Sequence, residues 1–336
     1  MQHSFPSVPL AAASDTVVQT AKAWTNSAAM RALVTAFGGD QTFLLDGAGD
    51  LITRVERLYT FSERWEGRAF GQERNQSTHL SMTPEQRETA LAATSALGLQ
   101  DGPPPQHAAY DHVLLLGGLI RACFNRPAFA AQLITSGAVR TSSVVALGGH
   151  RPFGTSDNPD RDEFVLATRL GHPELTEEYQ ALDLGTRDAF SLGEPTRVEG
   201  ERHDTIGGTW GIRHYVRPGG TTVQVAAAPS SEPDTRRAHT GDTYSFFAKR
   251  MGHLRPGARL LLVTTPIYVP SQHFTALHRL ALPYGVQVET VGRNPESLTG
   301  ALRTQYTPAH YLAEVRVAVR ALIGLLQAAT GATQRS

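Results

Sequence analysis

One strand ending in this sequence carries side chains suited to chemistry on a charged small molecule. The apolar run 143–148 predicts a buried strand, and Gly149, His150 and Arg151 follow it directly. Histidine titrates near neutral pH, and the planar guanidinium of arginine matches planar anions. We therefore expect anion clamping by Arg151 and proton transfer by His150 or Glu163. Because Glu163 opens the next helix, a simple capping role for its carboxylate is equally consistent with the sequence.

A second strand ending predicts backbone anion binding. The apolar run 112–117 stops at Gly117 and Gly118 and passes into a predicted helix over 121–136. Glycines let a ligand approach the backbone, and the N–H groups of a helix N-terminus attract phosphate or carboxylate. We expect such contacts from Gly117 and Gly118, and from the second glycine pair, Gly148 and Gly149, with Arg121 as an additional donor. A tight turn with a surface arginine is the alternative.

The third strand ending offers hydroxyl groups. The run 259–265 predicts a buried strand that ends in Thr264 and Thr265, and Tyr268 and His273 follow shortly after. Hydroxyls at this position could bind a phosphate or a ribose. Because the carboxyl ends of parallel strands meet at one edge of a sheet, all three strand endings are expected along a single crevice.

Several other chemistries are disfavoured by the motifs. The G-x-G-x-x-G fingerprint does not follow the first strand, and no G-x-S-x-G elbow is present. Cys123 has apolar neighbours and is interpreted as a buried structural thiol. The histidines form neither an H-x3-H nor an H-E-x-x-H pattern, so no metal site is predicted. A nucleotide or S-adenosylmethionine fits as a cofactor better than nicotinamide does.

Bulk composition limits the class of protein. The chain has 336 residues, zero formal net charge and 40% hydrophobic residues, which is typical of an ordinary globular protein. Neutral charge gives no overall attraction to nucleic acid or to an anionic membrane. A single cysteine excludes an internal disulfide, and no secretion signal or membrane span is recognisable in the sequence. These features predict a soluble, cytoplasmic protein.

The elements that position the three strand endings follow an α/β pattern. Helical periodicity predicts helices at about 14–37, 51–61 and 83–97, and a proline-rich linker follows at 101–106. We therefore predict a helical N-terminal domain (1–105) and a Rossmann-like domain (106–336) with a parallel sheet and a terminal helix, 309–326, packed on the body. The stretch 171–221 is interpreted as a long loop insertion that acts as a lid, or else as unrecognised short strands. The other predicted elements are strands at 222–228 and 286–291 and helices at 160–170, 240–251 and 270–282.

The order of these motifs resembles the YdcF/SanA-like family, a Rossmann-like family of largely undefined function. The resemblance covers about 108–326 and rests on both glycine pairs, on Asp162 and Glu163 at a helix start, and on the segments 239–243 and 263–273. It implies ligand contacts from Thr240 and Asp242 as well. Thr243 stands where the family has an amide, and Asp242 stands where the family has a longer acid.

These features together predict an enzyme of small molecules that transfers a group from an adenosine-containing or phosphorylated ligand. Two alternatives remain. One is a transferase that uses aminoacyl-tRNA, with an arginine-lined surface around Arg236, Arg237, Lys249 and Arg250. The other is a ligand sensor or scaffold without catalytic activity.

Overall fold

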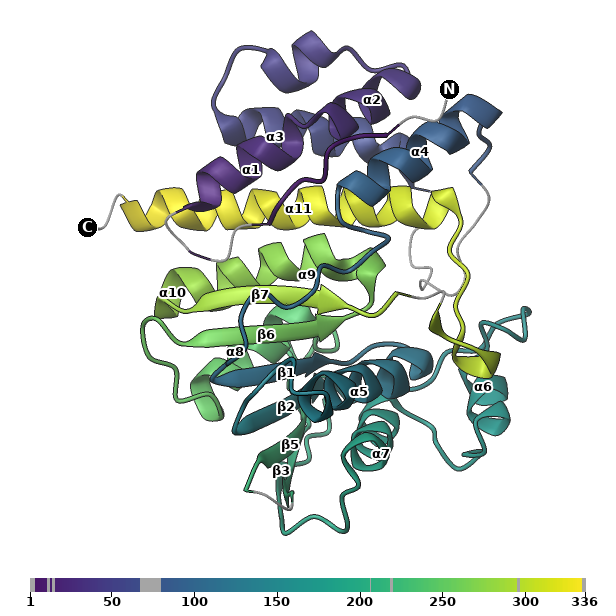
Figure 1. The fold of residues 1–336 in the computed structure, drawn as a ribbon, viewed down its shortest axis with the longest axis vertical. Coiled ribbons are helices and arrows are strands. Elements are labelled where there is room, and N and C mark those ends of the chain that lie inside the picture. Colours follow the sequence, from purple (N-terminus) through teal and green to yellow (C-terminus); the bar gives the residue numbers. More distant parts are fainter. Residues whose placement is uncertain are drawn as a thin grey trace.

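A seven-stranded sheet forms the centre of the protein (Figure 1). The computed structural model describes residues 4–10, 13, 16–66, 80–205, 207–217, 220–294 and 297–333. The strand order is β3-β4-β5-β2-β1-β6-β7. The five strands from β5 to β7 in that order are parallel, and β3 and β4 add an antiparallel pair at one edge. The predicted α/β fold with a mostly parallel sheet is therefore confirmed.

The strands occupy the following bounds: β1 (His112–Leu116), β2 (Ser143–Gly148), β3 (Arg197–Glu201), β4 (Trp210–Val216), β5 (Thr222–Ala227), β6 (Arg259–Thr264) and β7 (Gln287–Gly292). From β1 the chain adds β2 and then β5 on one side, and it later adds β6 and β7 on the other side. The strand order thus reverses between β1 and β6. In open α/β sheets, ligands bind outside the carboxyl ends of the strands at this point.

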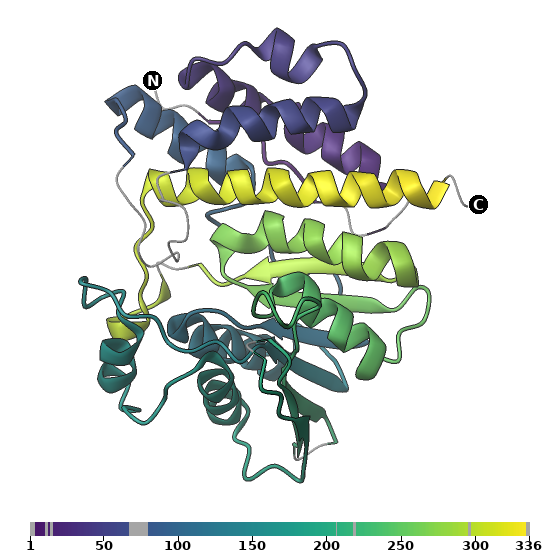
Figure 2. The ribbon, with the colours of Figure 1, turned by 180° about the vertical axis from the view of Figure 1, so that it is seen from behind.

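Helices cover both faces of the sheet. Helices α5 (Ile120–Thr135) and α7 (Glu178–Phe190) pack on one face, and α8 (Thr240–Arg250) and α9 (Val269–Ala276) pack on the other (Figure 2). Alternate strand residues face the two layers, as the period of two in an extended chain requires. Leu115 and Val263 belong to the cluster under α5 and α7, whereas Leu116 and Leu262 belong to the opposite cluster. The inner strands β1, β2 and β6 read as almost continuous apolar runs because both of their faces are buried.

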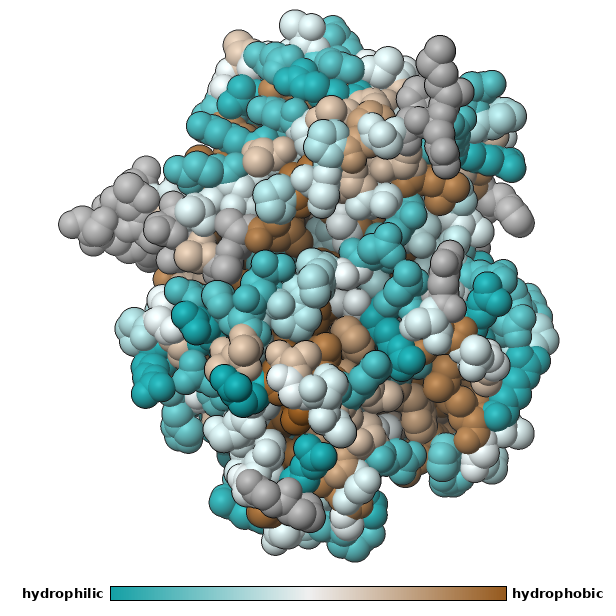
Figure 3. Space-filling view, in the orientation of Figure 1, coloured by the Kyte–Doolittle hydropathy of each residue, from teal (hydrophilic) through white to brown (hydrophobic). Residues whose placement is uncertain are grey.

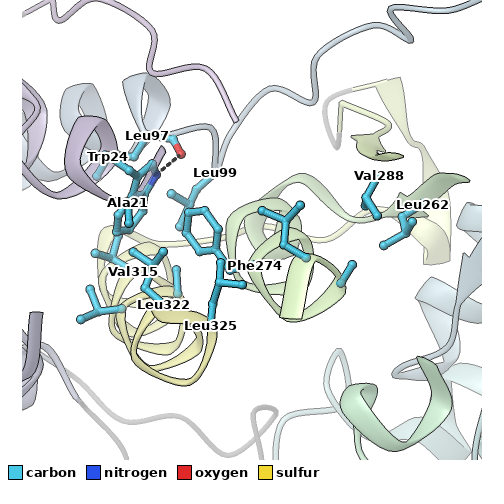
Figure 4. Close-up of a cluster of buried hydrophobic side chains, with 14 of the residues drawn as sticks. Ala21, Trp24, Leu97, Leu99, Leu262, Phe274, Val288, Val315, Leu322 and Leu325 are labelled. Carbon is cyan, nitrogen blue, oxygen red and sulfur yellow. Dashed lines mark hydrogen bonds between the residues drawn. The ribbon is translucent and has the colours of Figure 1, made fainter. Parts of the chain in front are cut away.

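The N-terminal helices share a hydrophobic core with the sheet domain. They are α1 (Val17–Thr25), α2 (Ala28–Ala36), α3 (Leu51–Phe61) and α4 (Pro84–Ala96), and they pack around the long terminal helix α11 (Pro308–Thr333). Figure 4 shows Trp24 and Leu97 beside Val315, Leu322 and Phe274, with the Trp24 indole donating to the Leu97 carbonyl. One cluster of buried residues runs from α1 through α11 and α9 to β6 and β7.

Local sequence signals set several helix boundaries. Helix α4 begins with two local signals, because the Thr83 hydroxyl accepts from the Gln86 amide and Pro84 occupies the first helical position. The predicted helix over 270–282 is built from α9, the π-helical turn η6 (Leu277–Ala281) and α10 (Leu282–Tyr284). The predicted start of the first helix, at residues 14 and 15, lies outside the described residues. The remaining short turns are η2 (Thr42–Asp46), η3 (Ser62–Trp65), η5 (Pro266–Tyr268) and η8 (Gly300–Leu302).

The stretch 171–221 is not a long loop, and the expectation of a loop insertion is wrong. It contains α7, β3 and β4, so the alternative of unrecognised strands was nearer the structure, although it missed the helix. Helix α7 begins without a side-chain cap, and it contains Gly185, which reads as a helix breaker in sequence. Gly185 is there because α7 packs closely on α5: a Cβ at this position would lie 2.2 Å from the Cys123 carbonyl oxygen.

Helix α6 (Glu163–Arg169) stands beside the carboxyl ends of the strands, next to the segment that leads into α11 (Figure 1). Figure 3 shows hydrophobic residues gathered at the lower right of the molecule. On α6 itself, Phe164 and Val165 are exposed. Among the described residues, no helix combines the length and apolar composition needed to cross a membrane.

Candidate functional site

A cavity of about 1060 Å³ opens at the carboxyl ends of β1, β2 and β6. Its walls come from both faces of the sheet, because α5, α8 and α9 all contribute, and α6 and the segment 298–314 cover it from the outside. The described residues that line it include nine arginines but only four aspartates and glutamates. Since the whole chain has no net charge, positive charge is concentrated in this cavity. Such a surface attracts anions.

The structure brings most of the predicted site residues together here. The cavity is lined by Gly117, Gly118, Arg121, Gly148, Gly149, His150, Arg151, Glu163, Thr240, Thr264, Thr265 and Tyr268. Two predicted ligand contacts do not line it. His273 is buried against Thr290, with its Nδ1 3.1 Å from the Thr290 hydroxyl. Asp242 caps helix α8, where it accepts from the His239 amide and from Arg236.

Arg151 is the centre of a buried ion network. Its guanidinium forms two bonds to the Glu163 carboxylate, at 2.7 and 2.9 Å, and its Nε donates to Glu178 at 2.9 Å. The carbonyls of Pro152 and Gly118 accept the other two N–H groups. Burial lowers the pKa of Arg151, but its bonds to Glu163 and Glu178 outweigh this and raise the pKa. All five donors of Arg151 are therefore used within the protein, which favours a positioning role over ligand clamping.

Glu163 occupies the helix N-terminus where we expected a ligand anion. Its carboxylate accepts from the Ile120 amide at the start of α5 and from the Gly154 amide, both at 2.9 Å, in addition to Arg151. Its side chain is 1% exposed. Four hydrogen-bond donors therefore surround this buried carboxylate. This geometry favours the capping interpretation of Glu163 over proton transfer.

Glu178, the first residue of α7, explains the glycines that end β1 and β2. A Cβ at Gly117 would lie 2.3 Å from the Glu178 Oε1 atom, and one at Gly148 would lie 3.0 Å from it. Burial raises the pKa of Glu178, and the charge of Arg151 opposes this shift. Gly117 and Gly148 therefore leave room for a carboxylate of the protein itself. Gly149 is different, because a Cβ there would meet only Ala238 and Ala228, at 3.5 Å or more.

Arg126 is the arginine at the point where the strand order reverses. It is 3% exposed and lines the cavity. Its Nη1 donates to the carbonyls of Leu116 and Gly117 after β1, at 2.6 and 2.5 Å, and its Nε and Nη2 donate to the Thr265 hydroxyl after β6, at 3.2 and 3.1 Å. These four bonds leave one of its five N–H groups for another acceptor. Among the described residues, no carboxylate lies within ion-pair distance of Arg126.

His150 contacts a second acidic residue at the start of α7. Its Nδ1 lies 3.1 Å from the Glu177 carboxylate, and its ring stands edge-on to Tyr179. A carboxylate bonded to Nδ1 fixes the tautomer and orients the ring so that Nε2 can exchange a proton. His150 is half-buried, with 26% of its side chain exposed. This arrangement makes His150 the better placed of the two predicted proton carriers.

The cavity wall includes buried polar atoms without a hydrogen-bond partner among the described residues. The Thr264 hydroxyl oxygen at the end of β6 and the Gln272 Oε1 atom on α9 are both of this kind. Thr264 is 1% exposed and Gln272 is 9% exposed. Buried polar groups in native proteins are nearly always hydrogen-bonded, so each such atom requires an explanation.

Arg121 is engaged with the outer wall of the cavity. It donates to the carbonyls of Ala301 and Asp160, at 2.6 and 2.5 Å, and so connects α5 to the segments that cover the site. Burial lowers the pKa of Arg121. Cys123, two residues further along α5, is completely buried, and burial raises the pKa of its thiol. The expected structural role of Cys123 fits this environment.

Sequence reasoning missed Arg126, Glu177, Glu178 and Gln272. Arg126 carried the clearest signal, because it stands within α5 among Cys123, Pro127 and Ala130, which are all buried. A cation on the buried face of a helix marks a functional site or an ion pair. Glu177 and Glu178 were hidden by the interpretation of their segment as a loop. Among the described residues, no group of three or more histidine, cysteine, aspartate or glutamate side chains could hold a metal ion.

The comparisons with known proteins place the chain in a family. A family model described as the Rv3785 N-terminal domain matches residues 9–98. The protein named "Uncharacterized protein Rv3785" from Mycobacterium tuberculosis (strain ATCC 25618 / H37Rv) is 30% identical over 331 residues, which cover 91% of this chain and 88% of the relative. "Uncharacterized protein Mb3814" from Mycobacterium bovis matches with the same identity and coverage. No solved structure matches the chain.

These matches correct the family expected from the motifs. The resemblance to the YdcF/SanA-like family rested on glycine-ended strands and a helix that opens with a glutamate, and both features have internal causes here. The glycines accommodate Glu178, and the glutamate caps α5. Neither feature is specific to one family of α/β proteins, whereas the mycobacterial relatives match along almost the whole chain. The chain belongs to the Rv3785 family.

Proposed function

We propose that the protein binds a phosphorylated small molecule in the arginine-lined cavity and transfers a group to or from it. The observation that carries the proposal is Arg126, a buried cation that lines the cavity where the strand order reverses. Removing a cation from water costs several kcal/mol unless a counter-charge compensates for it. A ligand phosphate beside Arg126 would supply that charge.

The groups of the protein around Arg126 compensate its positive charge only weakly. The carbonyls of Leu116 and Gly117 and the Thr265 hydroxyl accept hydrogen bonds but carry no net charge. Glu178 is the carboxylate whose charge most affects Arg126, and it is already paired with Arg151. Burial lowers the pKa of Arg126, which reflects the same unfavourable desolvation.

The charge of the cavity favours a phosphorylated ligand over S-adenosylmethionine. Nine arginines line the site, whereas S-adenosylmethionine carries a sulfonium and an ammonium group that such a surface repels. The volume of about 1060 Å³ is sufficient for a ligand of nucleotide size. We therefore narrow the expected ligand to phosphorylated compounds.

His150 supports group transfer as the reaction class. An acceptor hydroxyl or amine must lose a proton as it attacks the donor, and an imidazole oriented by Glu177 can take that proton at Nε2. The leaving group departs with the bonding electron pair and its phosphate held by Arg126. Arg151, Glu163 and Glu178 hold the strand endings that carry these groups.

The first test measures affinity by calorimetry with a panel of inorganic phosphate, sugar phosphates and nucleotides. We expect at least one organic phosphate to bind, and Arg126→Met to weaken that binding about a hundredfold, because a charge-assisted contact in a buried site contributes about 2–3 kcal/mol. Arg187→Met is the matched control, since Arg187 pairs with Glu194 on the surface outside the cavity. Equal affinities of the two variants would overturn the proposal.

Turnover of the ligand separates an enzyme from a sensor. Phosphorus NMR of the bound compound, incubated with candidate acceptors, reports any transfer. We expect His150→Gln to keep the affinity and to lose turnover by at least a hundredfold. Binding without turnover of any compound, in the wild type as well, would favour the ligand sensor instead.

A further inference from the structure

We infer that the phosphorylated ligand carries a sugar, and that Thr264 and Gln272 bind the sugar hydroxyls in a second subsite. This inference rests on the proposed function, because it places a neutral part of the same ligand beside the phosphate. The subsite lies on the opposite side of the sheet from Arg126. Its evidence is independent of Arg126.

Thr264 and Gln272 each hold a buried polar atom without a partner in the described part of the chain. The Thr264 hydroxyl oxygen and the Gln272 Oε1 atom are buried, line the cavity, and have no hydrogen-bond partner among the described residues. An unsatisfied buried polar atom destabilises a protein and is retained where a ligand satisfies it. The Gln272 oxygen accepts only, and a threonine hydroxyl can also accept. The complementary ligand group must therefore donate hydrogen bonds.

Thr264 and Gln272 face the same side of the sheet, because side chains alternate along β6. Leu260 and Leu262 face the cluster shared with α9 and α11, so Thr264, two residues after Leu262, faces the same side. Gln272 comes from α9, which covers that side. The hydroxyl of Thr265 instead contacts Arg126, which comes from α5 on the other side. A ligand that uses both subsites must cross the carboxyl end of β6.

The charge of the cavity limits which donor group can bind beside Thr264 and Gln272. A ligand that donates hydrogen bonds could carry an ammonium group or neutral hydroxyls. The arginines of the cavity disfavour an added cation. Tyr268 and Tyr306 line the same cavity, and aromatic side chains supply large apolar contact surfaces. Neutral hydroxyls on a sugar ring satisfy all of these conditions, in either a sugar phosphate or a nucleotide.

The test compares ligands with and without the hydroxyls, using calorimetry on the full chain. We expect AMP to bind at least tenfold more tightly than 2′,3′-dideoxy-AMP, because the analogue leaves Thr264 and Gln272 unsatisfied. In Thr264→Val and Gln272→Met this ratio should fall towards one. The affinity of ribose 5-phosphate, compared with that of AMP, shows which class of ligand carries the hydroxyls. Equal affinities indicate a sugar phosphate, and weaker binding of ribose 5-phosphate indicates a nucleotide.

A matched control and a stability measurement keep the test independent of folding. Thr275→Val removes a hydroxyl from α9, the helix that carries Gln272. The Thr275 hydroxyl lies outside the cavity and donates to the Ser271 carbonyl. This variant should keep the wild-type ratio. Thr264→Val should unfold at the same temperature as the wild type or higher, since it removes an unsatisfied buried hydroxyl. A lower unfolding temperature would show that Thr264 satisfies the fold rather than a ligand.

The outcomes separate this inference from the proposed function. If phosphorylated probes bind through Arg126 but the loss of the sugar hydroxyls changes no affinity, the hydroxyl subsite is wrong and the proposed function stands. If phosphoethanolamine binds through Gln272 in preference to AMP, an amine occupies the subsite and the inference is overturned. If no phosphorylated probe binds, the proposed function fails first.

Discussion

The glycines at the ends of β1 and β2 differ in what surrounds them, and this difference can be tested directly. Gly117 packs against the Glu178 carboxylate and the backbone of β2, whereas Gly149 has room for a side chain. We expect Gly117→Ala to lower the free energy of unfolding by about 1–3 kcal/mol, because the added methyl group overpacks a buried site. Gly149→Ala should change it by less than about 0.5 kcal/mol.

Urea denaturation of both variants measures this pair of values. The difference between the two changes in free energy of unfolding is the informative quantity. Both substitutions remove the same backbone freedom of glycine from the unfolded state, so this contribution cancels. A similar loss of stability in both would mean that Gly149 also accommodates a buried contact.

At the level of elements, helix α8 begins at a capping network that the sequence suggested as a ligand site. Asp242 accepts from Arg236 at 2.6 Å, from the His239 amide at 3.0 Å and from the Ser231 amide at 3.1 Å. Burial opposes ionisation of this carboxyl, but these hydrogen bonds outweigh it and lower its pKa to about 2. The same aspartate therefore links α8 to the loop that carries Arg236.

The depressed pKa of Asp242 predicts a definite pH dependence. Because the ionised form is favoured in the folded state, its contribution is complete above the ordinary value of 3.8 and disappears as the pH falls towards 2. We expect Asp242→Asn to cost about 1 kcal/mol at pH 7, as loss of a cap does, with solvent screening included. Chemical denaturation of both proteins should show the difference shrinking between pH 4 and pH 2. A difference that grows in acid would contradict this assignment.

How far the sequence predicts the structure depends on whether each element carries a local signal. The five parallel strands and the cap of α4 were predictable, because apolar runs and capping residues are local patterns. Helix α7 was not, since Gly185 serves a distant contact with Cys123. The same limit applies to the site: the strand endings located the cavity, but the pairing of Arg151 with Glu163 and Glu178 depends on tertiary structure.

At the level of the whole molecule, the N-terminal helices and the sheet should unfold together. Helix α11 buries Val315, Leu322 and Leu325 in the same cluster as Trp24 and Phe274. Each apolar side chain of this size contributes about 1.5–3 kcal/mol when it is fully buried. The fragment 106–336 would expose this face of α11, so we expect it to aggregate or to unfold at a much lower temperature than the full chain.

The measurement is thermal unfolding of the full chain by circular dichroism and by tryptophan fluorescence. In Trp210→Phe the remaining tryptophans, Trp24 and Trp65, report the N-terminal helices. We expect the two signals to change at one temperature. Two separate transitions, or a stable fragment 106–336, would indicate independent domains.

Cys123 provides a way to search for the ligand without knowing the reaction. The thiol is the one cysteine of the chain, and it lies fully buried in the first turn of α5, where it contacts the carbonyls of Gly118 and Glu178. A thiol reagent can therefore modify it only when this part of the structure opens. A compound that binds only the closed form makes opening rarer in proportion to its occupancy. Every such ligand should therefore lower the rate at which the reagent labels Cys123.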